Sequence, residues 1–195
     1  MQNNGVLQLF KRIGTPFAGF PVTLNGGSNS PVFLKKGSNL ANTSLTLLSD
    51  DGQHLRVNLV GKILFEAQLP RLSVSTKFRM VPDLNQTRYL ILRHDEDMLS
   101  VFSQEGNVLF ELPQFLSKDF EAQYYILSAA EHLLVLHDKS KQLSYFYNLS
   151  GQIALPSPIQ SGRPVTVLHS QREKSHTIFR IHNKSLLKMI YIAPQ

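Results

Sequence analysis

Residues 99–115 read LSVFSQEGNVLFELPQF, and this stretch decides the fold because a similar one returns along the chain. Residues 54–70 read HLRVNLVGKILFEAQLP, and residues 143–159 read LSYFYNLSGQIALPSPI. In each stretch an alternating apolar segment enters a turn with a glycine, and a second apolar segment follows. The glycines of the three turns are 45 residues apart: Gly61, Gly106 and Gly151. A period of this length indicates a chain built from repeated supersecondary units.

Composition places the chain among globular proteins. Of its 195 residues, 42% are hydrophobic and 17% are charged, and there is no cysteine. A disulfide scaffold and a thiolate metal site are therefore excluded. The first residues, MQNNGVLQLFKRIG, show no secretory leader, and no apolar run approaches the length of a membrane span. A cytoplasmic location is the default expectation, and no membrane insertion is expected.

Short segments rich in Val, Ile, Leu, Phe and Tyr recur between Gly, Pro, Asn and Asp clusters, which predicts an all-β chain. Each repeat divides into four strands, A to D. The predicted repeats span about 31–69, 75–113, 122–158 and 164–195. In the third repeat the predicted strands are Gln123–Ser128, Leu133–His137, Leu143–Tyr147 and Gln152–Pro156. The one helical candidate, Leu116–Ala122, is a short turn within a loop.

The last repeat has no D strand, and a matching segment occurs at the other end of the chain. Residues 4–10, NGVLQLF, copy residues 105–110, EGNVLF. An exposed sheet edge favours aggregation, and closing a ring of sheets removes such an edge. We therefore expect the N-terminal strand to join the last repeat and to seal the ring.

In period, strand order and this offset closure, the chain resembles β-propellers of the broad group that includes tryptophan–aspartate repeat and quinoprotein-like propellers. The Gly-His and Trp-Asp signatures are missing, and the chain has no tryptophan, so no particular family is assigned. The resemblance implies one domain over residues 1–195, built as a ring of four four-stranded antiparallel blades. The alternative is that the chain forms half of an eight-bladed ring made by two chains.

Three histidines lie at or near the ends of the predicted B strands: His94, His137 and His182. Aspartate or asparagine follows each one, and turn chemistry alone explains those acidic and amide residues. The histidines suggest a ligand-binding rim for a metal ion or a carboxylate-bearing partner. A metal site requires imidazoles that converge on one ion, whereas separate blades hold these three, so no metal is assigned.

The connections between D and A strands carry a second candidate set. Arg71, Lys118 and Arg163 lie 47 and 45 residues apart. Cations repeated at one level of a ring focus on an anion near its axis, and arginine is suited to bind a carboxylate or a phosphate through two hydrogen bonds. These residues are candidates for binding a small anion.

The function that the sequence favours is a non-enzymatic scaffold for a protein partner or for self-association. No nucleophile elbow, phosphate-binding loop or dinucleotide fingerprint occurs, and no cofactor is predicted. One alternative is a module that binds a small anionic ligand, a glycan or a polyanion, and another is a cryptic hydrolase. The net charge is +6, but the longest basic run is Lys35–Lys36, which disfavours nucleic acid.

Overall fold

The computed structural model describes residues 5–28, 30–113, 117, 119–154, 158–170, 175–182 and 186–192, with only the backbone described for 182 and 186–192. Contacts between Cα atoms divide the chain into a first unit, Met1–Pro113, and a second unit, Gln114–Gln195. The described residues form strands and turns, which confirms the all-β prediction. None of them belongs to a helix long and apolar enough to cross a membrane.

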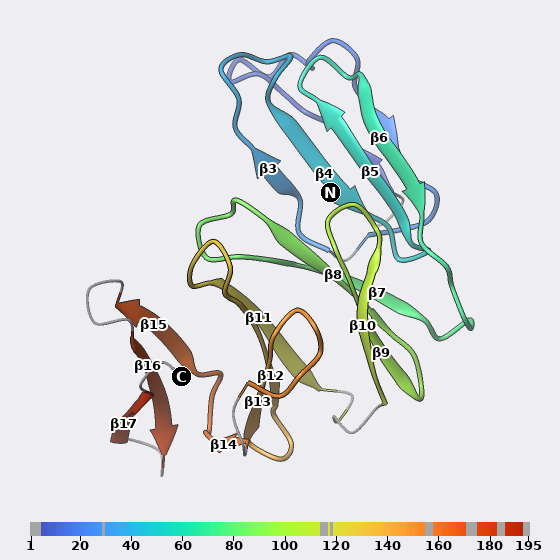
Figure 1. The fold of residues 1–195 in the computed structure, drawn as a ribbon. Coiled ribbons are helices and arrows are strands. Elements are labelled where there is room, and N and C mark those ends of the chain that lie inside the picture. The colour runs from blue at the N-terminus through green and yellow to red at the C-terminus, as the bar shows by residue number, and fades with distance from the viewer. Residues whose placement is uncertain are drawn as a thin grey trace. The chain divides into compact units, whose positions relative to one another are not determined.

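The first unit contains two four-stranded antiparallel sheets (Figure 1). In the first sheet the strands follow the order β3 (Phe33–Lys35), β4 (Ser44–Leu48), β5 (Gln53–Asn58) and β6 (Ile63–Gln68). In the second sheet the order is β7 (Lys77–Pro82), β8 (Tyr89–His94), β9 (Met98–Phe102) and β10 (Val108–Pro113). Each sheet is a meander in which consecutive strands are neighbours, as the A to D order predicted.

The second unit contains one sheet with the same order and one shorter sheet. The first is β11 (Phe120–Ile126), β12 (His132–Asp138), β13 (Leu143–Tyr147) and β14 (Ile159–Gln160). The second has three strands in the described residues: β15 (Thr166–Ser170), β16 (Ser175–His182) and β17 (Leu186–Ile192). The predicted strands A, B and C of the fourth repeat are thus present.

The turns between strands C and D share one geometry, which is the physical content of the 45-residue period. Their glycines have positive φ angles of 81°, 85° and 77° at Gly61, Gly106 and Gly151. Each glycine N–H donates to the carbonyl three residues earlier, at 3.0, 3.0 and 3.1 Å, on Asn58, Ser103 and Asn148. A left-handed backbone in a tight turn is the conformation that glycine adopts at least cost.

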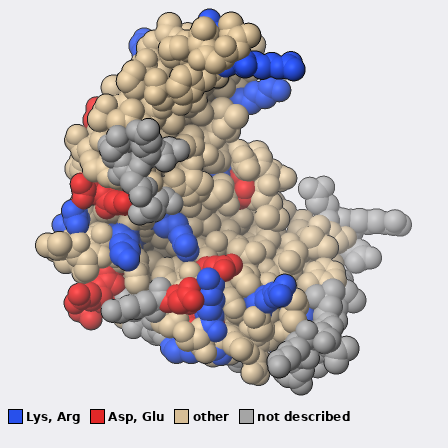
Figure 2. All heavy atoms as spheres, turned by 180° about the vertical axis from the view of Figure 1, so that it is seen from behind, with Lys and Arg blue, Asp and Glu red and all other residues tan. Residues whose placement is uncertain are grey.

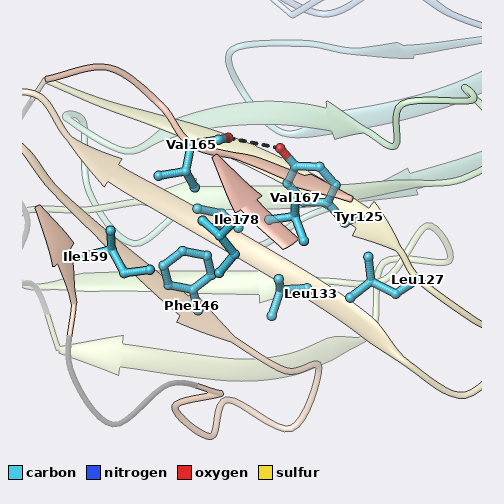
Figure 3. Packing of buried hydrophobic residues seen from close by; sticks show 9 residues of the cluster. Tyr125, Leu127, Leu133, Phe146, Ile159, Val165, Val167 and Ile178 are labelled. Carbon is cyan, nitrogen blue, oxygen red and sulfur yellow. Dashed lines mark hydrogen bonds between the residues drawn. The ribbon is translucent and has the colours of Figure 1, made fainter. Parts of the chain in front are cut away.

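In each unit the core lies between its two sheets. In the first unit, Phe33 of β3 packs on Tyr89 of β8 with ring centroids 4.8 Å apart. In the second unit, side chains of β11, β12 and β13 meet Val167 and Ile178 of the next sheet and Val165, which immediately precedes β15 (Figure 3). Inward-facing residues at alternate strand positions build both cores.

Within the described parts of the two chain ends, the predicted pairing of the N-terminal strand with the last blade is not seen. Strand β1 (Val6–Leu7) instead pairs with β2 (Val22–Thr23), a short strand of the same unit. Leu7 and Leu24 are buried in a cluster with β4 and β5. A local partner is favoured because closing a loop of about 14 residues costs about 2 kcal/mol less entropy than closing one of about 180.

Two smaller predictions in the third repeat differ from the structure in part. Residues 120–122, which were included in the helical candidate, belong to β11, while 114–116 and 118 lie outside the described residues. Of the predicted D strand Gln152–Pro156, the structure describes 152–154, where Ile153 forms a bridge with Tyr147. The strand that pairs with β13 further along is β14, and it begins after Pro158.

Candidate functional site

The aspartates at the ends of two B strands hold loops in place. Asp95 follows β8 and accepts a hydrogen bond from the Thr76 hydroxyl, just before β7. Asp138 ends β12 and accepts from the Ser117 N–H at 2.7 Å and the Ser117 hydroxyl at 2.8 Å, just before β11. The same contact thus joins the loop before strand A to the end of strand B in two repeats. These carboxylates perform a structural task.

The environment of Asp138 favours its charged form. Burial acts to raise the pKa of this carboxyl, but hydrogen bonds from Lys141 and Ser117 outweigh burial and lower the pKa below its ordinary value. A carboxylate that accepts several hydrogen bonds is held ionised. Asp138 therefore stays an acceptor for the loop it anchors over the neutral pH range.

The three predicted rim histidines have different surroundings. His137 is buried, and its Nδ1 lies 2.9 Å from the Ser144 hydroxyl on the neighbouring strand. Burial lowers the pKa of His137 against the opposing effect of Glu121 and Asp138. His94 ends β8 and is half-buried, and the side chain of His182 lies outside the described residues. His94 and His137 belong to different units, and the ligand-binding role of the three histidines stays a prediction.

Of the three predicted cations, the structure describes two. Arg71 is exposed and is held by Asp51, whose Oδ1 lies 2.5 Å from its Nη1, and by the Ser73 and Val74 carbonyls. Arg163 is exposed in the loop before β15. Lys118 lies outside the described residues. Because Arg71 and Arg163 belong to different units, the proposed anion site stays a prediction.

Charged residues are interspersed on the surface. On the face drawn in Figure 2, the charged residues are scattered among neutral ones, and basic and acidic residues occur together in the lower part of the view. Several basic side chains of the second unit are paired, as when Lys139 Nζ lies 3.1 Å from Asp119 and 3.0 Å from Glu121.

A buried ionic cluster occupies the second sheet of the first unit. Arg93 of β8 forms ion pairs with Asp95 at 3.1 Å and Glu111 at 3.2 Å. Its Nη2 also donates to the Ser100 hydroxyl at 2.7 Å, and its Nη1 donates to the Pro70 carbonyl at 3.1 Å. These partners surround the guanidinium with acceptors. The Arg93 cluster is therefore part of the scaffold.

The second unit contains a different polar cluster, which the sequence did not reveal: Glu131, His169 and His176. Glu131 Oε1 lies 2.8 Å from His176 Nε2, and His176 Nδ1 lies 3.0 Å from His169 Nδ1. One potential ligand atom from each residue lies within 4.8 Å of the other two. The two histidines are half-buried and Glu131 is exposed, so solvent reaches the cluster.

Strand pairing explains why these histidines meet. His169 of β15 and His176 of β16 are directly opposite each other in the antiparallel register. Opposed residues point to the same face, with Cβ atoms about 4.5 to 5.5 Å apart. Val167 and Ile178 form the next pair on that face and belong to the core between the two sheets. The histidine pair therefore lies on the core-facing side of the sheet, at the edge of the core.

Glu131 comes from the neighbouring sheet of the same unit. It lies in the turn before β12, where its N–H donates to the Ser128 hydroxyl at 3.0 Å and its carbonyl accepts from the Leu127 N–H at 2.9 Å. Leu127 packs in the same core as Val167 and Ile178. The shared core brings the turn to the histidine hairpin, and the sequence separation of Glu131 and His176 hides this contact.

Comparison with known proteins assigns the fold and not a family. No family model matches the sequence, and no curated protein matches it. The structure of BBS1N in complex with ARL6DN is similar, with a TM-score of 0.54 and 14% identity over 99% of this chain. This chain spans 60% of the length of BBS1N in that structure.

Two further solved structures are similar at lower scores. A protein of unknown function from Bacteroides caccae has a TM-score of 0.49 and 12% identity, over 97% of this chain and 72% of its own. A streptogramin B lyase has a TM-score of 0.47 and 13% identity, over 100% of this chain and 64% of its own. The structural neighbours are β-propeller proteins, which confirms the resemblance that the 45-residue period predicted.

Proposed function

We propose that this chain is a non-enzymatic propeller scaffold whose edge strand β6 binds an extended segment of a protein partner. The observation that carries the proposal is the apolar character of this edge. Ile63 and Leu64 are 51% and 47% exposed, and Val60 in the preceding turn is 48% exposed. In the described residues β6 pairs with β5 alone, so its outer edge is open.

An edge of this kind is unusual for a protein that acts alone. Natural sheets protect their edges with charged side chains, prolines or covering segments. Strand β6, ILFEAQ, contains one charged residue, Glu66, and no proline. An extended peptide that adds to such an edge gains main-chain hydrogen bonds and apolar contacts at once.

The similar BBS1N structure was determined with a bound protein, ARL6DN. That complex is a property of BBS1N, and it illustrates that a propeller surface can serve protein binding. Scaffolds of repeated sheets tolerate variation in their surfaces without loss of the core, which suits this role.

Cross-linking tests the proposal. The chain has no cysteine, so Leu64→Cys offers one attachment point for a photoreactive maleimide, and Val74→Cys offers a matched control at a 92% exposed loop residue. In extracts of the source cells, we expect Leu64→Cys to give one adduct that maps to one segment of one protein. Adding Ile63→Lys should abolish the adduct. Equal adducts at both positions, or none at position 64, would contradict the proposal.

The assembly of the ring is a separate question that remains a prediction. The mass of one chain is 22.0 kDa, so a one-chain ring gives that mass by light scattering and a two-chain ring gives twice that mass. If the partner that cross-links at position 64 is a second copy, the mass should fall to that of one chain in Ile63→Lys. This outcome would identify β6 as the self-association edge.

A further inference from the structure

We propose that His169 and His176 form a binding site for a divalent transition-metal ion of the class that imidazole prefers, with Zn²⁺ as the physiological representative. Glu131 positions His176 in this site. The inference is independent of the proposed function, because the cluster lies wholly in the second unit and β6 lies in the first.

The hydrogen-bond roles follow from the carboxylate. An ionised carboxylate only accepts hydrogen bonds, so the 2.8 Å contact with Glu131 Oε1 places a hydrogen on His176 Nε2. In the neutral imidazole the lone pair is then on Nδ1, the atom that lies 3.0 Å from His169 Nδ1. Without a metal, His169 Nδ1–H donates to that lone pair.

A metal ion replaces this hydrogen bond with little movement. Two imidazole nitrogens that bind one ion at about 2.0–2.1 Å with tetrahedral geometry lie about 3.3 Å apart. The observed separation of the two Nδ1 atoms is 3.0 Å, and the rings are tilted by 33° with centroids 4.8 Å apart. A small rotation of both rings directs the two lone pairs at one ion. His169 then carries its hydrogen on Nε2.

The role of Glu131 is that of an outer partner. A metal-bound histidine usually donates its other ring N–H to a carboxylate, which fixes the tautomer and makes the ligand more basic. The contact between Glu131 and His176 already has this arrangement. Because Glu131 is 50% exposed and the histidine pair is half-buried, ions and water can enter from solvent. Water completes the coordination of the ion.

The donor atoms favour a borderline metal ion over Ca²⁺ or Mg²⁺. The donors are two imidazoles, which suit Zn²⁺, Ni²⁺ and Cu²⁺, whereas Ca²⁺ and Mg²⁺ require oxygen ligands. The ion would also join the two strands of the β15–β16 hairpin. A ligand that binds only the folded state stabilises that state.

Titration calorimetry of the tag-free full chain with ZnCl₂ tests the site. We expect one ion per chain, with at least tenfold weaker binding in His169→Ala and in His176→Ala. Lys139→Ala is the control, since its exposed ion pairs with Asp119 and Glu121 lie in the same unit and outside the cluster, and it should bind as the parent does. Far-ultraviolet circular dichroism shows whether each variant is folded. Absence of Zn²⁺ binding in the parent up to 100-fold excess, or unchanged affinity in both histidine variants, overturns the proposal.

The positioning role of Glu131 has its own readout. Glu131→Ala should weaken Zn²⁺ binding about 10- to 100-fold, as is typical when an outer partner is lost. Glu131→Gln keeps an acceptor for His176 Nε2–H and should restore part of that affinity. In nitrogen-15 spectra of the histidine rings, the parent without metal should show hydrogen on His176 Nε2, and Glu131→Ala should mix the two tautomers. An unchanged tautomer in Glu131→Ala would overturn the positioning role.

Discussion

The Arg93 cluster of the first unit and the Glu131–His169–His176 cluster of the second unit each pair carboxylates with nitrogen-bearing side chains, but they differ in burial and in role. Arg93 and Asp95 have side chains that are 5% and 8% exposed, and Arg93 has protein acceptors around it. Glu131 is 50% exposed, and the two histidines contact each other through ring nitrogens. A buried ion pair is fixed by its partners, whereas a half-exposed pair of imidazoles can exchange a hydrogen bond for a ligand.

The burial of the side chains separates the structural polar residues of the first cluster from the candidate ligands of the second. In the sequence, the polar residues of both clusters occur near the ends of predicted strands, and nothing there distinguishes the two sets. Removing a buried charge from water is costly, so each buried charge must keep its partner. Residues at the rim of the core have no such constraint, and their partners can be replaced.

The largest effect is expected from breaking the buried cluster. Arg93→Met leaves Asp95 buried without its cation, and such a loss costs about 3–5 kcal/mol of unfolding free energy. Arg71→Met is the control, because its ion pair with Asp51 is 38% and 47% exposed, and exposed pairs contribute about 0–1 kcal/mol. Urea unfolding measures both. A loss of less than about 1 kcal/mol in Arg93→Met would contradict the structural role of the cluster.

A second effect concerns pH, again in the first unit. Burial, with Arg56 nearby, lowers the pKa of His54 from 6.5 to about 4, and its Nε2 lies 2.9 Å from the Tyr89 hydroxyl. Between about pH 6.5 and 4, His54 therefore binds a proton in the unfolded chain but stays neutral in the folded chain. Folding stability should fall by up to about 3 kcal/mol as pH drops through this window.

The measurement for His54 is urea unfolding at several values from pH 4 to 7 in the parent and in His54→Gln. Because carboxylates also titrate in this range, the difference between the two proteins isolates the histidine. The pH dependence should be shallower in the variant. Parallel curves would show that His54 does not resist protonation in the folded state.

A smaller effect distinguishes two turns that the 45-residue period makes equivalent. Gly61 and Gly106 both have positive φ, and an alanine there adds about 1–2 kcal/mol of strain. A Cβ at Gly61 would also lie 2.4 Å from the Gly19 carbonyl oxygen, whereas at Gly106 it would meet only the Leu69 side chain at 3.3 Å. Thermal unfolding should therefore show a larger loss for Gly61→Ala. Equal losses would mean that Gly19 moves away without cost.

The smallest effect is expected at the surface of the second unit. Lys139→Ala removes the exposed pairs with Asp119 and Glu121, and such pairs are screened by salt. We expect no measurable change in the urea midpoint at physiological ionic strength. A clear destabilisation would show that this surface network behaves as the buried Arg93 cluster does.

Local patterns predicted most of the strands, and long-range contacts decided the candidate site. The predicted strands of the fourth repeat, Val165–Ser170 and Thr177–His182, left His176 outside the hairpin, whereas the observed β16 begins at Ser175 and places His176 opposite His169. The predicted ligand-binding histidines were His94, His137 and His182 instead, because they recur with the repeat. Glu131 lies in another sheet and gave no sequence signal for its contact with His176.

The sequence by itself determined the 45-residue unit, because a glycine with positive φ and alternating apolar strands are local requirements that each repeat must satisfy. Only the tertiary structure decided the partner of the N-terminal strand, which is β2 rather than the last blade. It also decided which polar residues are sealed and which are open to solvent. Both depend on packing between sheets. The residues that make these contacts are far apart in sequence, so local sequence patterns do not show that they meet.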